Sequence, residues 1–96
     1  MVLATALFTV AIVAKAQDEE FEDLRILYMD EKYEKLISKS EKYTDKDDTR
    51  KDPTPYLYLS KAYFEISKRE EFNEDYPPEK AFRNAMKWAA KYRRKD

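Results

Sequence analysis

The chain contains no glycine, no cysteine and no histidine. Without cysteine it forms no disulfide and offers no thiolate for metal binding or nucleophilic attack. Without histidine it lacks the commonest general base and metal ligand. The absence of glycine excludes phosphate-cradling loops and most tight β-hairpins. These absences favour helices and disfavour most enzymes, so we expect an all-α protein that is not an enzyme and holds no cofactor or metal.

Charged and aromatic residues are abundant instead. Charged residues make up 41% of the chain, while eight tyrosines and five phenylalanines supply enough apolar area for a core. Ninety-six residues allow one domain. The charge is uneven, because residues 17–52 hold 13 acidic and 8 basic side chains, whereas residues 53–96 hold 7 acidic and 10 basic ones. The two halves therefore differ in the sign of their net charge, which would orient an approaching partner. The alternative is that these charges belong to ordinary solvated helix faces.

The N-terminal segment reads as an export signal. Residues 2–14 are uncharged and mostly apolar, and Ala14-Lys15-Ala16 then gives the small-x-small pattern that signal peptidase cleaves. Thirteen residues are too few for a bilayer-spanning helix, which needs about 20. We therefore predict a signal peptide over residues 1–16 and a periplasmic or secreted protein that begins at Gln17. Because no Lys or Arg precedes the apolar run, a buried first helix and an uncleaved membrane anchor stay open as alternatives.

Apolar residues recur at helical spacing in four segments, which predict helices at about residues 17–29, 33–43, 55–69 and 78–95. The polar run Asp30-Glu31-Lys32 predicts a break between the first two helices, although one continuous helix over residues 18–44 is the alternative. Thr54 is expected to cap the third helix through its hydroxyl, with Pro55 at the first helical position. Pro78 is expected to open the last helix.

Two connections complete the predicted layout. Residues 44–52 contain no apolar side chain between the second and third helices, which predicts a solvated connection. Residues 70–77 are polar and predicted to be irregular, with Phe72 and Tyr76 resting against the helices.

Tyr56-x2-Leu59-Ser60-x2-Tyr63 resembles the first half of a tetratricopeptide repeat, W-x2-L-G-x2-Y, with Tyr in place of Trp and Ser in place of Gly. A shift of about 36 residues places Phe21 on Leu57 and Arg25 on Lys61, close to the period of that family. The resemblance to exported bacterial members of the family implies a short α-solenoid of two stacked antiparallel helix pairs. Residues 17–52 would be the first pair and its linker, and residues 53–96 the second pair, with an extended loop between its helices.

In such a repeat the first helix of each pair lines a concave wall. The resemblance therefore implies partner-binding positions at Arg25, Tyr28, Leu57, Lys61, Phe64 and Glu65. Aromatic and cationic groups on one wall would suit an extended or helical peptide that carries a carboxylate. The alternative is that the apolar members complete the core and the cations are solvated.

We expect an exported interaction module that docks a protein or peptide partner on its concave face or its open C-terminal helix. Two repeats leave an apolar side of residues 81–92 uncovered, which also predicts self-association or continuation into further repeats. A membrane-tethered accessory subunit of an envelope complex is the alternative function, and its membrane contact would be the uncleaved N-terminus. Nucleic acid is not an expected partner, because an exported protein does not meet it.

Two clusters of carboxylates do not support a catalytic or metal-binding role. The aspartates of residues 45–52 lack the glycine that a tight calcium loop needs at its sharp turn. Glu70 and Glu71 are consecutive, so on a helix their carboxylates point apart and could not act together on one glycosidic bond.

Overall fold

The computed structural model describes residues 19–95, and this part of the chain is all-helical, as the sequence predicted. The predicted signal peptide, residues 1–16, lies outside the described residues. The elements are a 3-10 turn η1 (Glu19–Phe21), α2 (Glu22–Met29), α3 (Tyr33–Asp45), α4 (Thr54–Ser67), a 3-10 turn η2 (Glu70–Phe72) and α5 (Pro78–Lys95). None of the described helices is long and apolar enough to cross a membrane.

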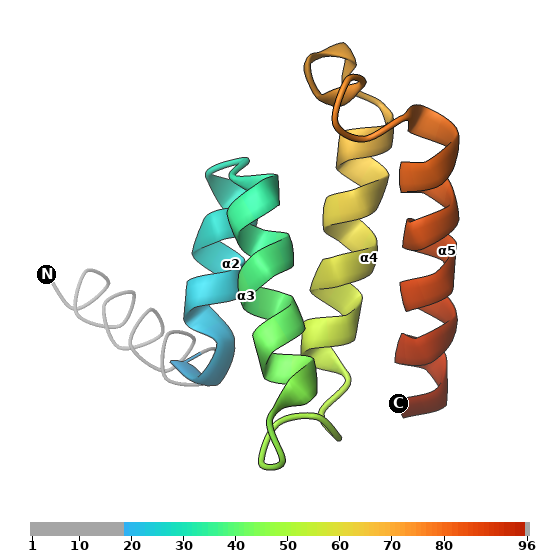
Figure 1. The fold of residues 1–96 in the computed structure, drawn as a ribbon. Coiled ribbons are helices and arrows are strands. Elements are labelled where there is room, and N and C mark those ends of the chain that lie inside the picture. Colours follow the sequence, from blue (N-terminus) through green and yellow to red (C-terminus); the bar gives the residue numbers. More distant parts are fainter. Residues whose placement is uncertain (1–18, 96) are drawn as a thin grey trace, which may run out of the picture.

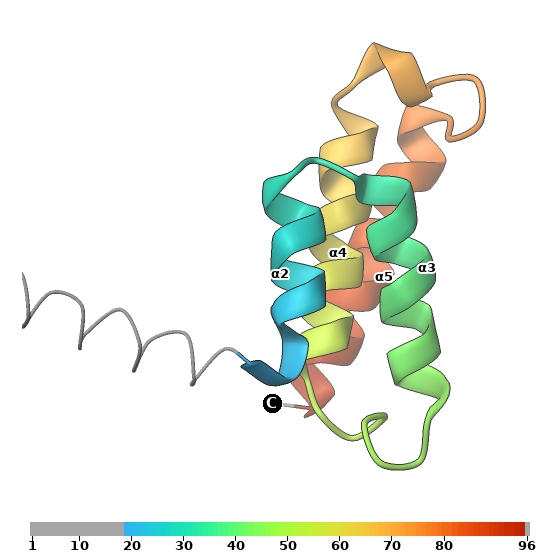
Figure 2. The ribbon, with the colours of Figure 1, turned by 90° about the vertical axis from the view of Figure 1, so that its left-hand side faces the viewer.

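The helices run alternately up and down and form two hairpins, α2–α3 and α4–α5 (Figure 1). α4 lies in the middle, with α3 packed on one side and α5 on the other. A view from the α2–α3 side shows α4 behind the space between α2 and α3, with α5 farther back (Figure 2). The described elements are therefore stacked in sequence order, and α2 and α5 lie at opposite ends of the stack.

The core lies where α4 meets α2 and α3. Leu24, Leu36, Leu59 and Ile66 are fully buried there, one or two from each of these helices. Ala62 and Ala81 join them and allow close helix approach because their side chains are small. Eight partly buried aromatic rings surround this cluster, together with Leu27: Phe21, Tyr28, Tyr43, Tyr58, Tyr63, Phe72, Tyr76 and Trp88. The aromatic content thus compensates for the few aliphatic residues in the core.

The repeat-like block on α4 packs as its residue types suggest. Tyr56 and Leu59 are buried, and Tyr63 is half-buried. The small Ser60 faces α5 closely enough for its hydroxyl to donate a 2.8 Å hydrogen bond to the Ala85 carbonyl oxygen. The Tyr56 ring lies 5.9 Å from the ring of Trp88 on α5. The aromatic and small residues of the block therefore hold the second hairpin together.

The predicted break between the first two helices is present. α2 ends at Met29, and Glu31 takes a left-handed conformation with φ of 60°. Backbone N–H groups of residues 30–32 bond back to carbonyls of residues 26–28, so the last turn of α2 is closed without glycine. The alternative of one continuous helix over residues 18–44 is wrong.

The start of α4 differs from the prediction. Thr54 is the first helical residue and Pro53 the cap, so the predicted hydroxyl cap by Thr54 is wrong. The carboxylate of Asp52 instead accepts a 3.0 Å hydrogen bond from the Thr54 N–H. Pro55 then falls in the first turn, where its missing N–H costs nothing.

Three other predicted boundaries shift: α2 begins at Glu22 after a 3-10 turn, α4 ends at Ser67, and Glu70–Phe72 form a 3-10 turn inside the loop that was predicted to be irregular. The start of α5 agrees with the prediction. Pro78 begins α5, and both Phe72 and Tyr76 are half-buried against the core.

Candidate functional site

The predicted wall residues Tyr28 and Lys61 are in direct contact. The Tyr28 ring is half-buried at the junction of α2 and α4, where it meets the rings of Tyr33 and Tyr58 edge-on. The ammonium of Lys61 lies 5.1 Å from the centre of the Tyr28 ring, within cation–π range. Tyr28 thus contributes to the hairpin junction, while Lys61 keeps its charge at the exposed surface above it.

Phe64 and Glu65 are joined through a residue that the sequence analysis did not select. Lys68 lies 4.7 Å above the Phe64 ring and 3.3 Å from a Glu65 carboxylate oxygen. Glu65 also pairs with Arg69 at 3.3 Å, and its side chain is only 17% exposed. Glu65 is therefore occupied by contacts within the chain, whereas Phe64 presents its ring to solvent.

Arg25 and Leu57 are the two predicted wall residues that remain, and both are half-buried. Arg25 is held by a 3.0 Å ion pair with Glu22, and it donates a 3.4 Å hydrogen bond to the sulfur of Met29. Leu57 is half-buried on α4, two turns before Phe64. The structure thus brings together Tyr28 with Lys61, and Phe64 with Glu65 through Lys68, while Arg25 and Leu57 join neither pair.

Arg69 links the two hairpins, and the sequence analysis missed it. Its guanidinium donates hydrogen bonds to Glu31 at 3.3 Å, to the Tyr33 hydroxyl at 3.2 Å and to Glu65 at 3.3 Å, and it lies 5.0 Å from the centre of the Tyr33 ring. These partners come from two hairpins and from positions up to 38 residues away. Local spacing indicates only the i,i+4 pair with Glu65 and carries no signal for the contacts with Glu31 and Tyr33.

An open apolar face lies on α4 and α5, formed by Phe64, Phe82 and Met86. Their exposed fractions are 43%, 49% and 58%, and the Phe64 and Phe82 rings lie 6.5 Å apart. Phe64 is two residues from both Ala62 and Ile66, so it points away from the side of α4 that packs on α3. This open α4–α5 face therefore lies on a side of the stack that no described helix covers. An uncovered apolar side was predicted on residues 81–92, and the open face includes Phe82 and Met86 of that segment.

The helix α5 carries a large excess of positive charge. Its 18 residues contain seven cations and one carboxylate, Glu79, which gives a net charge of +6. None of these charges forms an ion pair with another residue of the described range 19–95. Lys87 and Lys91 instead lie 4.9 and 4.8 Å from the Trp88 ring centre. The α5 surface thus offers unneutralised cations to an acidic ligand.

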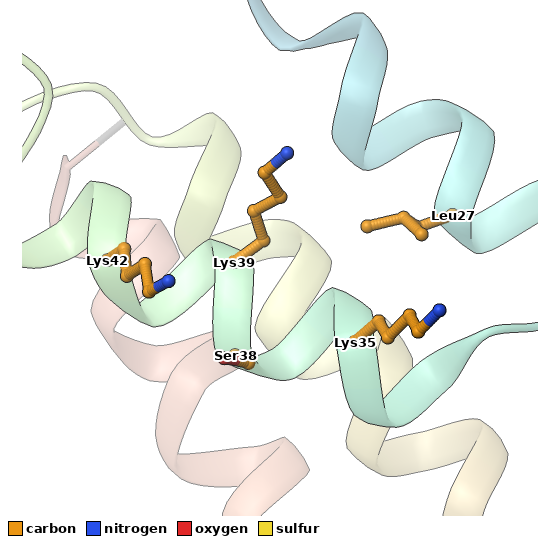
Figure 3. A pocket seen from close by; sticks show the side chains of 5 residues that line it. All are labelled: Leu27, Lys35, Ser38, Lys39 and Lys42. Atoms are coloured by element: carbon orange, nitrogen blue, oxygen red, sulfur yellow. The ribbon is translucent and has the colours of Figure 1, made fainter.

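A second cationic surface lies between α2 and α3. Lys35, Lys39 and Lys42 line a groove of about 270 Å³ with Leu27 and Ser38 (Figure 3). Lys39 is already paired with Asp23 at 3.5 Å. Helical spacing separates the lysines of α3 from its carboxylates, which lie along the other edge of its exposed side: Glu34, Glu41 and Asp45. The lysine groove is therefore a narrow strip of positive charge.

No group of three or more metal-ligating side chains gathers within the part of the chain that the structure describes. Comparison with known protein families, with curated proteins and with solved structures gives no match.

Proposed function

We propose that the chain is a tetratricopeptide-like interaction module that docks a helix of another polypeptide on the open α4–α5 face. The observation that carries this proposal is the exposed Phe64–Phe82 pair with Met86 beside it. Large apolar side chains gathered on one exposed face mark protein contact sites more often than scattered ones do. An amphipathic helix suits a shallow face between two adjacent antiparallel helices, because its apolar side can cover their exposed rings.

The charge around this face selects the partner's chemistry. Lys68 lies over the Phe64 ring, and the α5 cations flank Phe82 and Met86. A partner helix with carboxylates beside its apolar stripe would neutralise these cations, while a basic helix would be repelled. Lys61, above Tyr28, extends the same positive rim toward α2. The proposed partner is therefore an acidic amphipathic helix. The proposed site of action is the periplasm or the extracellular medium, which follows from the predicted signal peptide.

Site-specific cross-linking in the native host tests the proposal. The expected result is one or a few proteins that cross-link to the full chain and are lost from the variant Phe82→Gln/Met86→Gln. Both replaced residues are exposed, so the variant should keep the fold, which circular dichroism checks. The matched control is Lys35→Gln/Lys42→Gln in the lysine groove of α3, which should retain the same partners. Equal cross-linking of all three proteins would overturn the proposal.

A further inference from the structure

Both end helices of the stack expose apolar residues and they carry opposite charge, and this identifies a partner for the open α4–α5 face. At the α2 end, Ile26 and Met29 are 45% and 67% exposed. On the other end helix, α5, Phe82 and Met86 are exposed, and Phe64 of the neighbouring helix α4 lies beside Phe82. Apart from Phe64, the large apolar side chains that are exposed within the described range therefore lie on the two end helices, α2 and α5.

The ends carry opposite charge. Residues 20–31 hold five carboxylates and one cation, for a net charge of −4, and α5 carries +6. Part of the acidic charge is neutralised within the chain, because Glu22 pairs with Arg25 and Asp23 with Lys39. Glu20 and Asp30 form no ion pair within the described residues. The cations of α5 form none there either.

The contact between α3 and α4 inside the chain provides a template for contact between copies. On α3 the residues Leu36 and Ser40 are buried, and on α5 the residues Ala81 and Ala85 are buried at the same spacing. The next residue along is Ile37 on α3 and Phe82 on α5. Ile37 is buried in the cluster that includes Leu59, Ala62 and Ile66 of α4, whereas Phe82 is exposed. Phe82 therefore stands at the position where the next helix of a continuing stack would pack.

The matching helix is α2. The repeat offset that pairs Arg25 with Lys61 also pairs Ile26 with Ala62. Ala62 is fully buried in the cluster that contains Ile37, whereas Ile26 is exposed. By these offsets Ile26 is equivalent to Ala62 on α4, and Phe82 is equivalent to Ile37 on α3. Contact between Ile26 of one copy and Phe82 of another would therefore repeat, between copies, the packing of α4 on α3 within the chain.

We propose that copies of this chain associate head to tail, with α2 of one copy docked against α5 of the next. The proposal rests on the proposed function and names its partner. Since α3 and α4 run antiparallel, the same arrangement places the start of α2, with Glu20 and Glu22, near Arg93 at the end of α5. It places Asp30 near Arg83. The apolar residues of both helices then meet between two pairs of opposite charges.

A head-to-tail contact joins two different surfaces, the α2 end of one copy and the α5 end of the next, so each surface can be blocked separately. The variant Ile26→Gln/Met29→Gln blocks the α2 end, and Phe82→Gln/Met86→Gln blocks the α5 end, with no charge added to either. Sedimentation velocity should show wild-type oligomers that grow with concentration, with a Kd between about 1 µM and 1 mM. Each blocked variant should be monomeric, and their equimolar mixture should form a 1:1 dimer.

Charge provides a second arm of the experiment. The variant Arg83→Gln/Arg93→Gln should weaken wild-type association about tenfold, and raised salt should weaken it further. Lys35→Gln/Lys42→Gln removes the same charge from the lysine groove of α3 and should leave association unchanged. All variants have the same N-terminal segment as the wild type, so association through that segment would persist in both blocked variants.

Three results would overturn the proposal: a wild-type monomer throughout this range, association that survives in both blocked variants, or no dimer on mixing them. If the chain is monomeric but a different protein cross-links to wild type and is lost from Phe82→Gln/Met86→Gln, the interaction function stands and self-association is rejected. If neither a second copy nor another protein depends on Phe82 and Met86, both proposals fail.

Discussion

At the scale of single residues, two serines on neighbouring helices have opposite roles in stability. Ser40 is fully buried on α3, and its hydroxyl has no hydrogen-bond partner among the described residues. Ser60 faces α5 and donates a 2.8 Å hydrogen bond to the Ala85 carbonyl. A buried hydroxyl without a partner has lost its hydration and gained nothing in return. The two sites therefore respond in opposite directions to removal of the hydroxyl.

We expect Ser40→Ala to raise the free energy of unfolding by about 1 kcal/mol and Ser60→Ala to lower it by about 1 kcal/mol. Urea denaturation followed by circular dichroism measures both values, and each serine serves as the other's control. A loss of stability in Ser40→Ala would mean that its hydroxyl has a partner, such as an ordered water.

Four tyrosines make the fold sensitive to alkali. Burial raises the pKa of Tyr33, Tyr63 and Tyr76, and the hydrogen bond that Tyr43 donates to Asp23 at 2.8 Å, aided by burial, raises the pKa of Tyr43. The folded protein therefore holds these phenol protons more tightly than the unfolded chain, in which the tyrosine pKa is about 10. This stabilisation is complete below about pH 10 and is lost as the pH rises through the raised values of the folded state.

Urea denaturation at several values between about pH 8 and about pH 11.5 tests this expectation. Wild-type stability should fall over the upper part of the range. Tyr43→Phe should be less stable at pH 8, because the bond to Asp23 is missing, and should lose less stability in alkali. Parallel curves for the two proteins would show that ionisation of Tyr43 does not contribute.

At the scale of elements, the break between α2 and α3 depends on a strained residue. Glu31 has a φ of 60°, a conformation that costs a residue with a Cβ about 1–2 kcal/mol. Its carboxylate also pairs with Arg69 at 3.3 Å, so a simple replacement changes two interactions. Comparing two replacements that both remove the carboxylate separates the backbone term from the ion pair.

We expect Glu31→Gly to be more stable than Glu31→Ala by about 1 kcal/mol, because glycine adopts this conformation without a steric penalty. Thermal and urea unfolding of the two variants measure the difference. Equal stabilities would indicate that the break relaxes to a conformation with negative φ at no cost.

The elements differ in how far the sequence alone predicts them. The four helices, the break at residues 30–32 and the start of α5 at Pro78 were predictable, because periodicity and proline act over one or two turns. The cap of α4 was not, because the helix begins one residue earlier than a Thr54 cap requires: Thr54 is already helical, and its N–H bonds to the Asp52 carboxylate. The apolar stripe of α5 also covers two sides of that helix, so spacing could not tell the buried Ala81 and Ala85 from the exposed Phe82 and Met86.

The candidate site was predictable only in part. The repeat resemblance selected Phe64 and Lys61, which the structure places at the surface of α4. It also selected Glu65, which is engaged by Lys68 and Arg69. The contacts of Lys68 with Phe64 and Glu65 follow helical spacing along α4, but those of Arg69 with Glu31 and Tyr33 cross between the hairpins. A single sequence carries no record of such long-range pairs.

At the scale of the whole molecule, stacking in sequence order makes stability uneven. α4 is packed on two sides, by α3 and by α5, whereas α2 and α5 each lie at an end of the stack. α2 is also only eight residues long, too short to be stable by itself. In such a one-dimensional arrangement the end elements can open while the centre stays folded.

We therefore expect amide hydrogen exchange to be slowest in α4, faster in α2 and fastest in the last turns of α5, which contain no buried residue. Exchange measured by mass spectrometry in dilute solution tests this order. If copies stack head to tail, protection of α2 and α5 should rise with protein concentration while α4 changes little, because only the end helices gain new neighbours. The Phe82→Gln/Met86→Gln variant should show the same gradient at every concentration. Uniform protection across all four helices would contradict the expected order, since it would require the ends to open only when the centre does.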